Sequence, residues 1–523
     1  MNDHSFWRPR ACVRGSAWCL VVVLLTVLAA AGCWRSTDEP VEIRNQGPDG
    51  PLVFSTYLGG ARDDAARDVA VDRQGYVYVT GGTSSGDFPV TAGAYQTKFN
   101  PGAPDSSHVQ PSDVFVTKLS PNGAIVWSTL IGGPNHDRAY AITIGADGYV
   151  YVAGRAGRSF PVTPGALQTE FMGGQPASLY GEQDGFVCKL TPNGGAVVFC
   201  SYFGTSDSSI IRDLAVDQHG DIYIASAYSS GAFPAPIARA FNNRPHGGRD
   251  AVVAKLKSDG SGVLWATYLG GSGEESNQNS IRLDAAGNPY LLITTASTDA
   301  ETTPGAYQRT HGGDEDLYVA KLTPDRGALV WATYLGGPQN ESTETHELAV
   351  DASGNVHIAA PTKSPSFPTT PGAFQRKFGG VHDIFVAKLS ADGSRLLAST
   401  FIGGDKEDRA EGVAVDAFGN VHFTGVTASS NFPLTADAVQ SRRRGSRNAV
   451  AVVLAADFSR LLFSTLLGGD GDQSGRGAAV DAQGSFHLIG ETQARNWPLR
   501  NAAQRSHGGG LDAFVVKFTF PRR

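Results

Sequence analysis

The residues best suited to bind a ligand are the acids that follow each Gly-Gly pair of this chain. Carboxylates from several loops are the hard oxygen ligands that Ca²⁺ prefers, and they could equally hold sugar hydroxyls or a basic partner. A solvated acidic rim that keeps the protein soluble is the alternative. We predict a binding rim without a metal or other cofactor, and we keep Ca²⁺ as the alternative. The predicted rim comprises Asp63, Asp64, Asp137, Asp207, Glu274, Glu275, Glu341, Asp405, Glu407, Asp408, Asp470 and Asp472.

Three histidines, His357, His422 and His487, stand at matching places in the last three of a series of repeats. Zinc requires ligand nitrogens about 2.1 Å from one ion. Equivalent strands of neighbouring sheets lie roughly 10 Å apart, so these rings cannot converge on one metal. We therefore expect them to pack between sheets.

No nucleophile–base motif is visible in the chain. It lacks Gly-x-Ser-x-Gly, His-Glu-x-x-His, a phosphate-binding loop and a dinucleotide fingerprint. Scattered acids could still meet in three dimensions, because repeats hide such a site. We predict no catalytic residues. The alternative is a hydrolase or lyase of extracellular polysaccharide, and carboxylates about 5–9 Å apart would favour the hydrolase.

Two cysteines, Cys188 and Cys200, flank a short turn and occupy places that Ala320 and Ala332 hold in another repeat. Small residues at both places indicate directly opposed positions on adjacent strands, where a disulfide can close. An oxidising compartment would favour that bond. We expect the disulfide, with two reduced thiols in small packing sites as the alternative.

All these candidates lie on a unit that recurs seven times at intervals of 65 to 73 residues. One copy reads Phe-Ser-Thr-Tyr-Leu-Gly-Gly over residues 54–60, and a degraded copy covers residues 200–204. Seven copies at this period predict an all-β fold, a seven-bladed β-propeller of four-stranded antiparallel blades. The fold alone does not define an activity. The other copies end at Gly133, Gly271, Gly337, Gly404 and Gly469.

Each repeat contains four short strand signals, rich in β-branched and aromatic residues and bounded by turn residues. The chain begins with a fourth-strand signal at residues 52–60 and ends with a third-strand signal at residues 512–518. We therefore expect the N-terminal strand to join the last blade and close the ring, which removes an exposed sheet edge. The connections from strand four to strand one and from strand two to strand three share one face. Their length and variety predict the binding face there.

The repeated motifs resemble those of the bacterial SBBP (seven-bladed beta-propeller) repeat family. The quoted elements are a Phe-Pro-x-Thr-x-Gly-Ala-x-Gln segment, as at residues 88–96, and an Asp-x-Phe-Val-x-Lys-Leu strand, as at residues 113–119. The resemblance covers about residues 52–520. It implies a secreted or surface propeller, with no defined reaction and no catalytic residues to transfer. The chain departs from the pattern at residues 233–236, Asn448 and Val453.

The N-terminus predicts export and lipid attachment. Three arginines precede an apolar run over residues 17–31, which is shorter than the roughly 20 residues of a bilayer span. The sequence Ala-Ala-Gly-Cys ending at Cys33 resembles the lipobox of bacterial lipoproteins, in which that cysteine is lipidated. An ordinary signal peptide or an uncleaved anchor is the alternative. The predicted organisation is a lipoprotein signal over residues 1–32, lipidation at Cys33, a flexible tether over 33–50 and the propeller over 51–520.

Composition agrees with an envelope protein. The 43 basic and 50 acidic residues give a net charge of −7, which argues against binding to nucleic acid. We predict an exported monomer, lipid-anchored to the outer membrane or cell surface and touching the membrane only through its anchor. Its predicted role is a non-catalytic binding or scaffold module for a protein or glycan partner.

Overall fold

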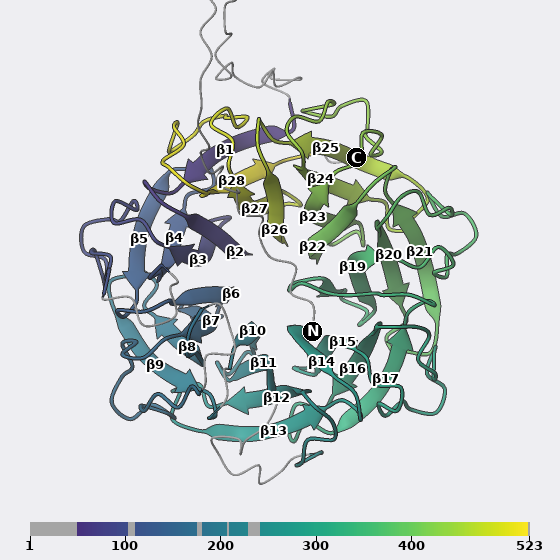
Figure 1. Ribbon diagram of the computed structural model, residues 1–523, viewed down its shortest axis with the longest axis horizontal. Coiled ribbons are helices and arrows are strands. Elements are labelled where there is room, and N and C mark those ends of the chain that lie inside the picture. Colours follow the sequence, from purple (N-terminus) through teal and green to yellow (C-terminus); the bar gives the residue numbers. More distant parts are fainter. Residues whose placement is uncertain (1–49, 103–109, 175–179, 207–208, 229–240, 521–523) are drawn as a thin grey trace, which may run out of the picture. The chain divides into compact units, whose positions relative to one another are not determined.

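The computed structural model describes residues 50–102, 110–174, 180–206, 209–228 and 241–520. Throughout these residues the regular structure is β-strand. Seven four-stranded antiparallel sheets form blades around a central channel (Figure 1). The predicted fold class is confirmed.

Blades 1 to 3 follow one another along the chain, each with its first strand beside the channel and its fourth at the outside (Figure 1). Blade 1 contains β2 (Asp64–Val71), β3 (Val77–Thr83), β4 (Asp113–Leu119) and β5 (Ile125–Ile131); blade 2 contains β6 (Arg138–Ile144), β7 (Val150–Ala156), β8 (Asp184–Leu190) and β9 (Val197–Phe203); blade 3 contains β10 (Ile211–Val216), β11 (Ile222–Tyr228), β12 (Asp250–Leu256) and β13 (Val263–Leu269).

Blades 4 to 6 repeat this order, and blade 7 combines the two ends of the described chain. Blade 4 contains β14 (Glu275–Leu283), β15 (Pro289–Thr295), β16 (Asp316–Leu322) and β17 (Leu329–Leu335); blade 5 contains β18 (Leu348–Val350), β19 (Val356–Thr362), β20 (Asp383–Leu389) and β21 (Leu396–Ile402); blade 6 contains β22 (Asp408–Val415), β23 (Val421–Thr427), β24 (Asn448–Leu454) and β25 (Leu461–Leu467); blade 7 contains β26 (Gln473–Val480), β27 (Phe486–Thr492), β28 (Asp512–Phe518) and β1 (Leu52–Leu58).

Ring closure occurs as predicted. The N-terminal β1 pairs with β28, with Thr56 opposite Val515. The Tyr57 hydroxyl donates to the Ala494 carbonyl at 2.7 Å, and the Trp497 indole donates to the Ser55 hydroxyl at 2.8 Å. The two ends of the ring are therefore joined by side chains as well as by the strand ladder.

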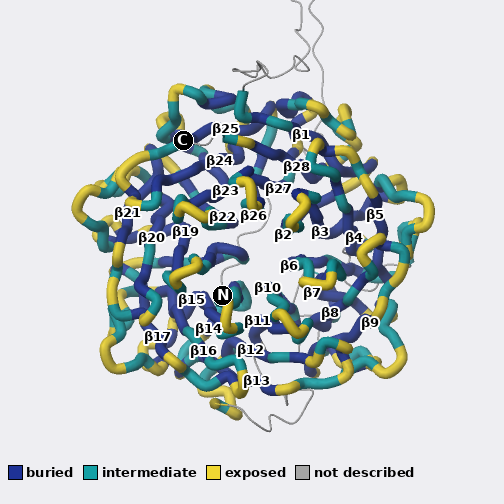
Figure 2. The backbone as a smooth tube through the Cα atoms, turned by 180° about the vertical axis from the view of Figure 1, so that it is seen from behind, coloured by how far each residue is buried: buried dark blue, intermediate teal, exposed yellow. Residues whose placement is uncertain are grey.

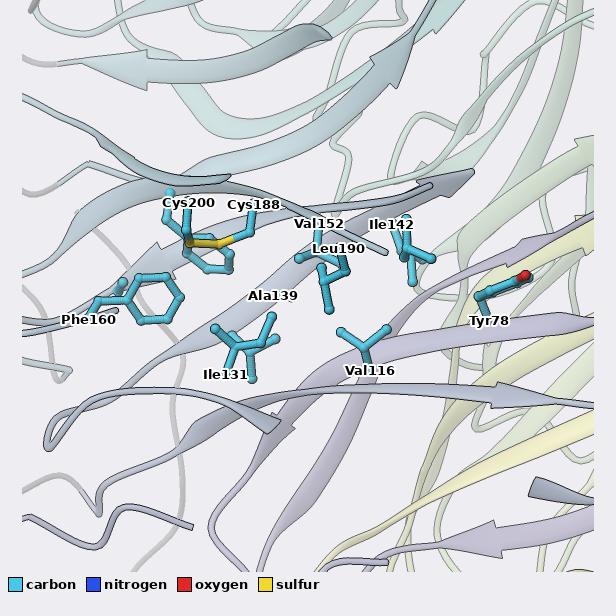
Figure 3. Packing of buried hydrophobic residues seen from close by; sticks show 14 of the residues in the cluster. Tyr78, Val116, Ile131, Ala139, Ile142, Val152, Phe160, Cys188, Leu190 and Cys200 are labelled. Atoms are coloured by element: carbon cyan, nitrogen blue, oxygen red, sulfur yellow. A yellow bond between two sulfur atoms is a disulfide. The ribbon is translucent and has the colours of Figure 1, made fainter. Parts of the chain in front are cut away.

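The core lies between blades. Both faces of a middle strand are covered by neighbouring blades, so β4 is almost entirely buried rather than alternating. Figure 3 shows Val116 and Ile131 of blade 1 near Ile142 and Leu190 of blade 2, within one apolar cluster. Exposure is concentrated at turns and loops (Figure 2). In the described chain no helix is long and apolar enough to cross a membrane.

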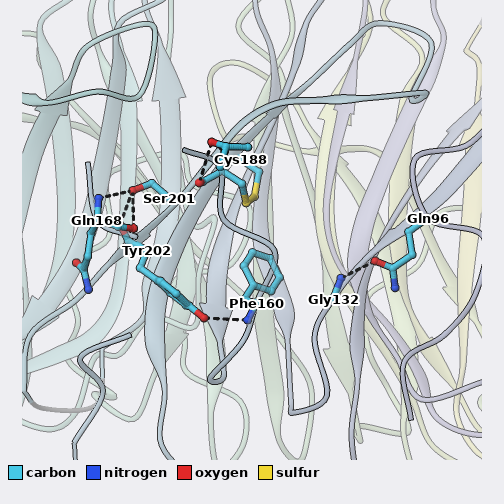
Figure 4. Close-up of a disulfide and its surroundings, with 9 residues drawn as sticks. Gln96, Gly132, Phe160, Gln168, Cys188, Ser201 and Tyr202 are labelled. Atoms are coloured by element: carbon cyan, nitrogen blue, oxygen red, sulfur yellow. Dashed lines mark hydrogen bonds between the residues drawn. A yellow bond between two sulfur atoms is a disulfide. The ribbon is translucent and has the colours of Figure 1, made fainter. Parts of the chain in front are cut away.

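The Phe-Pro-x-Thr-x-Gly-Ala-x-Gln segment covers the outer edge of its own blade. In blade 1 the Thr91 amide donates to the Ser128 carbonyl at 3.0 Å, and the Leu130 amide donates to the Gln96 carbonyl at 3.0 Å. The Gln96 side chain also accepts from the Gly132 amide at 3.1 Å (Figure 4). The segment thus satisfies edge groups that would otherwise be open to another strand.

Blade 2 contains the expected cysteine pair. Cys188 on β8 lies directly opposite Cys200 on β9, and a disulfide joins them (Figure 4). In blade 4 the same places hold Ala320 opposite Ala332. Cys33, the predicted lipidation site, lies outside the described residues, as do residues 1–49 as a whole.

Candidate functional site: the central channel and its loop face

The face of the ring that carries the connections from strand four to strand one and from strand two to strand three is called the loop face here. The other face, with the short hairpin turns, is the turn face. On the loop face, five acids of the predicted rim are buried. Their burial argues against a solvated rim, the alternative to the predicted binding rim, at these positions. They are Asp64, Asp137, Glu275, Glu341 and Asp408.

These buried acids hold the loops in place. The Gly60 amide donates to Asp64 at 2.6 Å, and the Gly404 amide donates to Asp408 at 2.7 Å. The Ser429 hydroxyl also donates to Asp408 at 2.7 Å. A carboxylate with several donors is thereby committed to the fold rather than to a ligand.

A second buried acid begins each third strand, except in blade 6. In blade 5, Asp383 accepts from the Gly379 amide at 2.7 Å. A Cβ on Gly403, the first glycine of the repeated pair, would lie 2.6 Å from Asp383 Oδ1, so only glycine fits there. Burial raises the pKa of Asp113 and Glu275 to about 7.

Four other rim acids are exposed, and two are half-buried. Asp405 accepts from the Ser430 amide at 2.9 Å, and Asp472 pairs with Arg447 at 3.3 Å. Within the described chain, no three rim acids bring ligand atoms within 4.8 Å of one another. Asp207 lies outside the described residues. The exposed acids are Asp63, Glu274, Asp405 and Asp470, and the half-buried ones are Glu407 and Asp472.

The residues that line the channel were missed by sequence reasoning. The first strands of five blades carry a β-bulge. The bulged residues, five positions before the hairpin turn, line one cavity of about 30 Å³. Arginine stands at three of these five places, tyrosine at one and glutamate at one, and this variation in type is the signal that could have revealed them. They are Arg67, Tyr140, Arg212, Glu411 and Arg476.

Four arginines gather on the side of blades 1 to 3; together they are called the arginine cluster. The guanidinium groups of Arg212 and Arg155 lie 4.5 and 5.2 Å from the centre of the Tyr140 ring. Arg155 also stacks on Tyr180 at 3.8 Å, and Arg138 lies 5.7 Å from the same ring. The cluster consists of Arg67 on β2, Arg138 on β6, Arg155 on β7 and Arg212 on β10.

The opposite side of the channel is acidic and better neutralised. Arg476 pairs with Glu411 and lies 2.5 Å from Glu491. Glu344 accepts from the Gln278 amide group at 3.0 Å. The loop-face mouth therefore has an arginine-rich half and a glutamate-rich half.

His346 lies between this mouth and a wider well of about 390 Å³ on the turn-face side, which Asp68 and Asp213 line. Its Nε2–H donates to the Tyr140 carbonyl at 2.9 Å, and its Nδ1 lies 3.6 Å from Asp213. The histidine reaches this place because the connection before the first strand is longer in blade 5. Asp351 follows Gly337 by 14 positions, whereas Asp72 follows Gly60 by 12 in blade 1. The short β18 starts only after this extra chain.

Asp68, Asp213 and His346 bring one ligand atom each within 4.8 Å of one another, so the set could hold a metal ion. However, Arg282 already lies 2.5 Å from Asp213. Burial opposes protonation of His346, but Asp68 and Asp213 outweigh it and raise its pKa. Arg282 and His346 therefore already lie against the two aspartates, and these four residues are called the plug of the channel.

The pKa of Tyr140 is strongly shifted at this mouth. Burial opposes its ionisation, but the charges of Arg155, Arg212, Arg138 and Arg67 outweigh burial and lower its pKa to about 7. Positive potential from the arginine cluster is therefore strong enough to stabilise an anion inside the channel.

The matching histidines act within their own blades. His357 and His487 each lie 3.1 Å from the acid of their own hairpin turn, Asp351 and Asp481. Tyr78 donates to Asp72 at 3.1 Å in the same way. The rings pack between sheets, as expected.

Residues 53–89 match the family described as a beta-propeller repeat, SBBP. The chain carries an SBBP repeat. The regulatory protein FlaEY of Caulobacter vibrioides is 24% identical over 371 residues, which is 70% of this chain and 30% of that protein. The match therefore spans less than a third of that relative.

Solved structures of other propellers give weaker likenesses. The WD40 propeller domain of Doa1 is 11% identical, with a TM-score of 0.43 over 91% of this chain and 98% of that one. A protein of unknown function from Dyadobacter fermentans is 11% identical, with a TM-score of 0.41 over 90% and 100%. A PL25 ulvan lyase is 10% identical, with a TM-score of 0.42 over 86% and 94%.

The repeated positions of the SBBP unit and the positions that line the channel have different roles. Repeated positions of the matched unit, such as Asp64 and Phe88, are buried in contacts that build the blade. The bulge position within the same unit, Arg67, faces the cavity and is tyrosine in blade 2 and glutamate in blade 6. Residues whose type varies between blades therefore line the channel.

Proposed function

We propose that this chain is an exported, lipid-anchored propeller that binds a protein or glycan partner at the loop-face mouth of its channel, without catalysing a reaction. One observation carries the proposal. The repeated polar residues are used by the fold, whereas the blade-specific charged residues gather at this mouth.

The size of the mouth supports binding rather than turnover. Its cavity of about 30 Å³ admits one small chemical group, and His346 lies at its inner end. A partner would therefore present a side chain or a sugar substituent rather than insert a chain. The relative named a regulatory protein accords with a role without catalysis.

Export and anchoring rest on the N-terminal sequence and on Cys33. Two or more acyl chains hold a protein on a membrane stably, whereas one does not. We expect the Cys33→Ser variant to leave the membrane fraction. Retention of that variant in washed membranes would contradict the lipid anchor.

Crosslinking in the native envelope tests the binding role. The tagged, lipidated protein is captured with its neighbours, which are identified by mass spectrometry. We expect the same partner from the wild type and from Arg395→Glu, an exposed turn-face control, and its loss from Arg155→Glu/Arg212→Glu. Partners unchanged by the double substitution would contradict a loop-face site.

One observation favours an enzyme as the second candidate. A tyrosine whose pKa is lowered to about 7 beside arginines could move a proton from a sugar acid. This alternative predicts unsaturated products from acidic polysaccharides, and their loss in Tyr140→Phe. Absence of product with the wild-type protein would exclude it for the polysaccharides tested.

A further inference from the structure

The arginine cluster contains more positive charge than its surroundings neutralise. Arginine side chains remain protonated in proteins. Among the described residues, only one carboxylate, that of Glu491, lies within 4.0 Å of any of these four side chains. It is 3.5 Å from Arg67 and is shared with Arg476, which it approaches to 2.5 Å.

Hydrogen bonding in the cluster is also incomplete. The Nε atom of each of the four arginines is buried, and none of them has a hydrogen-bond partner within the described part of the chain. Arg155 is only 4% exposed and donates through its Nη2 atom to the Tyr140 hydroxyl. Arg212 donates to Asn277 at 3.2 Å. Ionised Tyr140 would supply at most one negative charge against four positive ones.

Other arginines of the channel have carboxylate partners. Arg476, at the equivalent bulge of blade 7, has two carboxylate partners, Glu411 and Glu491. Arg282, at the plug, lies against Asp213. The shortage of anions is therefore specific to blades 1 to 3.

Removing a cation from water without giving it a partner costs free energy, and a bound anion would offset that cost. The planar fork of a guanidinium matches the oxygens of a carboxylate or sulfate. We propose that the arginine cluster is a binding site for a single oxyanion, a carboxylate or sulfate group, which enters the loop-face mouth beside Tyr140. The small volume of the mouth restricts the ligand to one such group at a time.

The proposal rests on the proposed function in placing recognition at this mouth, and it names the chemistry recognised. The carboxylate of a sugar acid and a free inorganic anion share this chemistry. Sodium sulfate, sodium acetate and sodium D-glucuronate are therefore used as separate probes, with sodium chloride holding ionic strength constant.

Isothermal titration of the full-length chain tests the site. We expect at least one probe to bind with one-to-one stoichiometry, and tighter binding of glucuronate than of acetate would identify a sugar acid as the source. Removal of one charge-assisted contact should weaken binding about tenfold or more. We expect this loss in Arg212→Gln and in Arg155→Gln, but not in Arg395→Gln on the turn face.

Thermal melting under the same conditions shows whether each variant is folded, and it measures binding independently as a rise in melting temperature. The wild type and Arg395→Gln should melt at higher temperature with the bound probe, because a ligand of the folded state stabilises it. Arg212→Gln, which retains the other three arginines, should show a smaller rise. No binding by any probe, or equal binding by Arg212→Gln, Arg155→Gln and wild type, would overturn the proposal. Partner capture could still succeed in that case, so the two hypotheses fail separately.

Discussion

The acids beneath the Gly-Gly pairs are buried, whereas most of the charged residues of the channel are half-buried, and the two sets also differ in how they recur around the ring. The first set recurs from blade to blade. Beneath Gly468 the two acids are replaced by Asn448 and Gln473, which are uncharged. The second set varies in type, with arginine in blades 1, 3 and 7, Tyr140 in blade 2 and Glu411 in blade 6. Within a repeat protein, a buried polar position that recurs serves the fold. One that varies is the place to look for function.

Both regions depend on a closed ring, so the largest effect should follow its opening. Deletion of residues 52–58 removes β1, whose side chains are almost all buried, and leaves β28 as an open edge. We expect loss of the cooperative melting transition, measured by circular dichroism. Deletion of residues 38–48 is the control. Equal melting temperatures for the two deletions would contradict a shared dependence on closure.

Loss of an arginine should reduce the stability more in the glutamate-rich half of the mouth than in the half formed by the arginine cluster. Arg476→Gln leaves Glu411 and Glu491 without their shared cation, and removing one partner of a buried ion pair destabilises by about 3 kcal/mol. Arg212→Gln, at the equivalent bulge, relieves repulsion among arginines. We expect its change to be within about 0.5 kcal/mol in anion-free buffer.

Denaturant titration of these two variants measures the difference in stability. A similar loss in both would remove the distinction between the two halves of the mouth. Substitution of Arg395, exposed on the turn face, provides the matched reference.

The repeated acids should affect stability without affecting binding. Asp408→Ala leaves the Gly404 amide and two hydroxyl donors buried without an acceptor, so we expect a loss of about 2 kcal/mol. Asp405→Ala, three residues earlier and exposed, should leave the stability nearly unchanged. Anion binding should be the same in both variants. A loss of binding in Asp408→Ala, with the fold intact, would make the repeated acids part of the site.

The smallest effect concerns pH. Burial raises the pKa of Glu275 from 4.5 to about 7, so the folded protein holds a proton that the unfolded chain releases. Its contribution to stability is present at low pH and is lost as pH rises from about 4.5 through 7. We expect Glu275→Gln, which copies Gln473, to reduce the fall in stability between pH 5 and pH 8 by on the order of 1 kcal/mol.

Melting curves across this range measure the slope for wild type and variant. The acids of the hairpin turns do not interfere, because hydrogen bonds to Asp351 and Asp481 outweigh their burial and lower their pKa. These groups titrate only at more acidic pH. An unchanged slope in Glu275→Gln would show that this carboxyl is ionised in the folded state at neutral pH.

Much of the fold could be read from the sequence because its signals are local. The period of the Gly-Gly octads indicated seven blades. The order of strand signals placed β1 beside β28, as the structure confirms. Strand pairing over a short hairpin depends on neighbours a few residues away, so Cys188 and Cys200 could also be placed opposite each other.

The roles of polar residues were decided only by the tertiary structure. Asp64 and Asp63 are adjacent in sequence and both acidic, yet one is buried against the Gly60 amide and the other is exposed. The local sequence cannot distinguish them, because the difference depends on which donors the folded loops bring to each carboxylate. Five of the predicted binding acids are buried in this way.

The channel site is the clearest case of long-range assembly. Arg67, Arg138 and Arg212 lie about 70 residues apart in the chain, one on the first strand of each of three blades, and Arg155 joins them from β7. Each looks like an ordinary charged residue in its own repeat. Only closure of the ring brings them around Tyr140, and the bulges of the first strands turn Arg67, Tyr140 and Arg212 into the same cavity. The sequence by itself determined the architecture, and the tertiary structure determined which charges meet without partners.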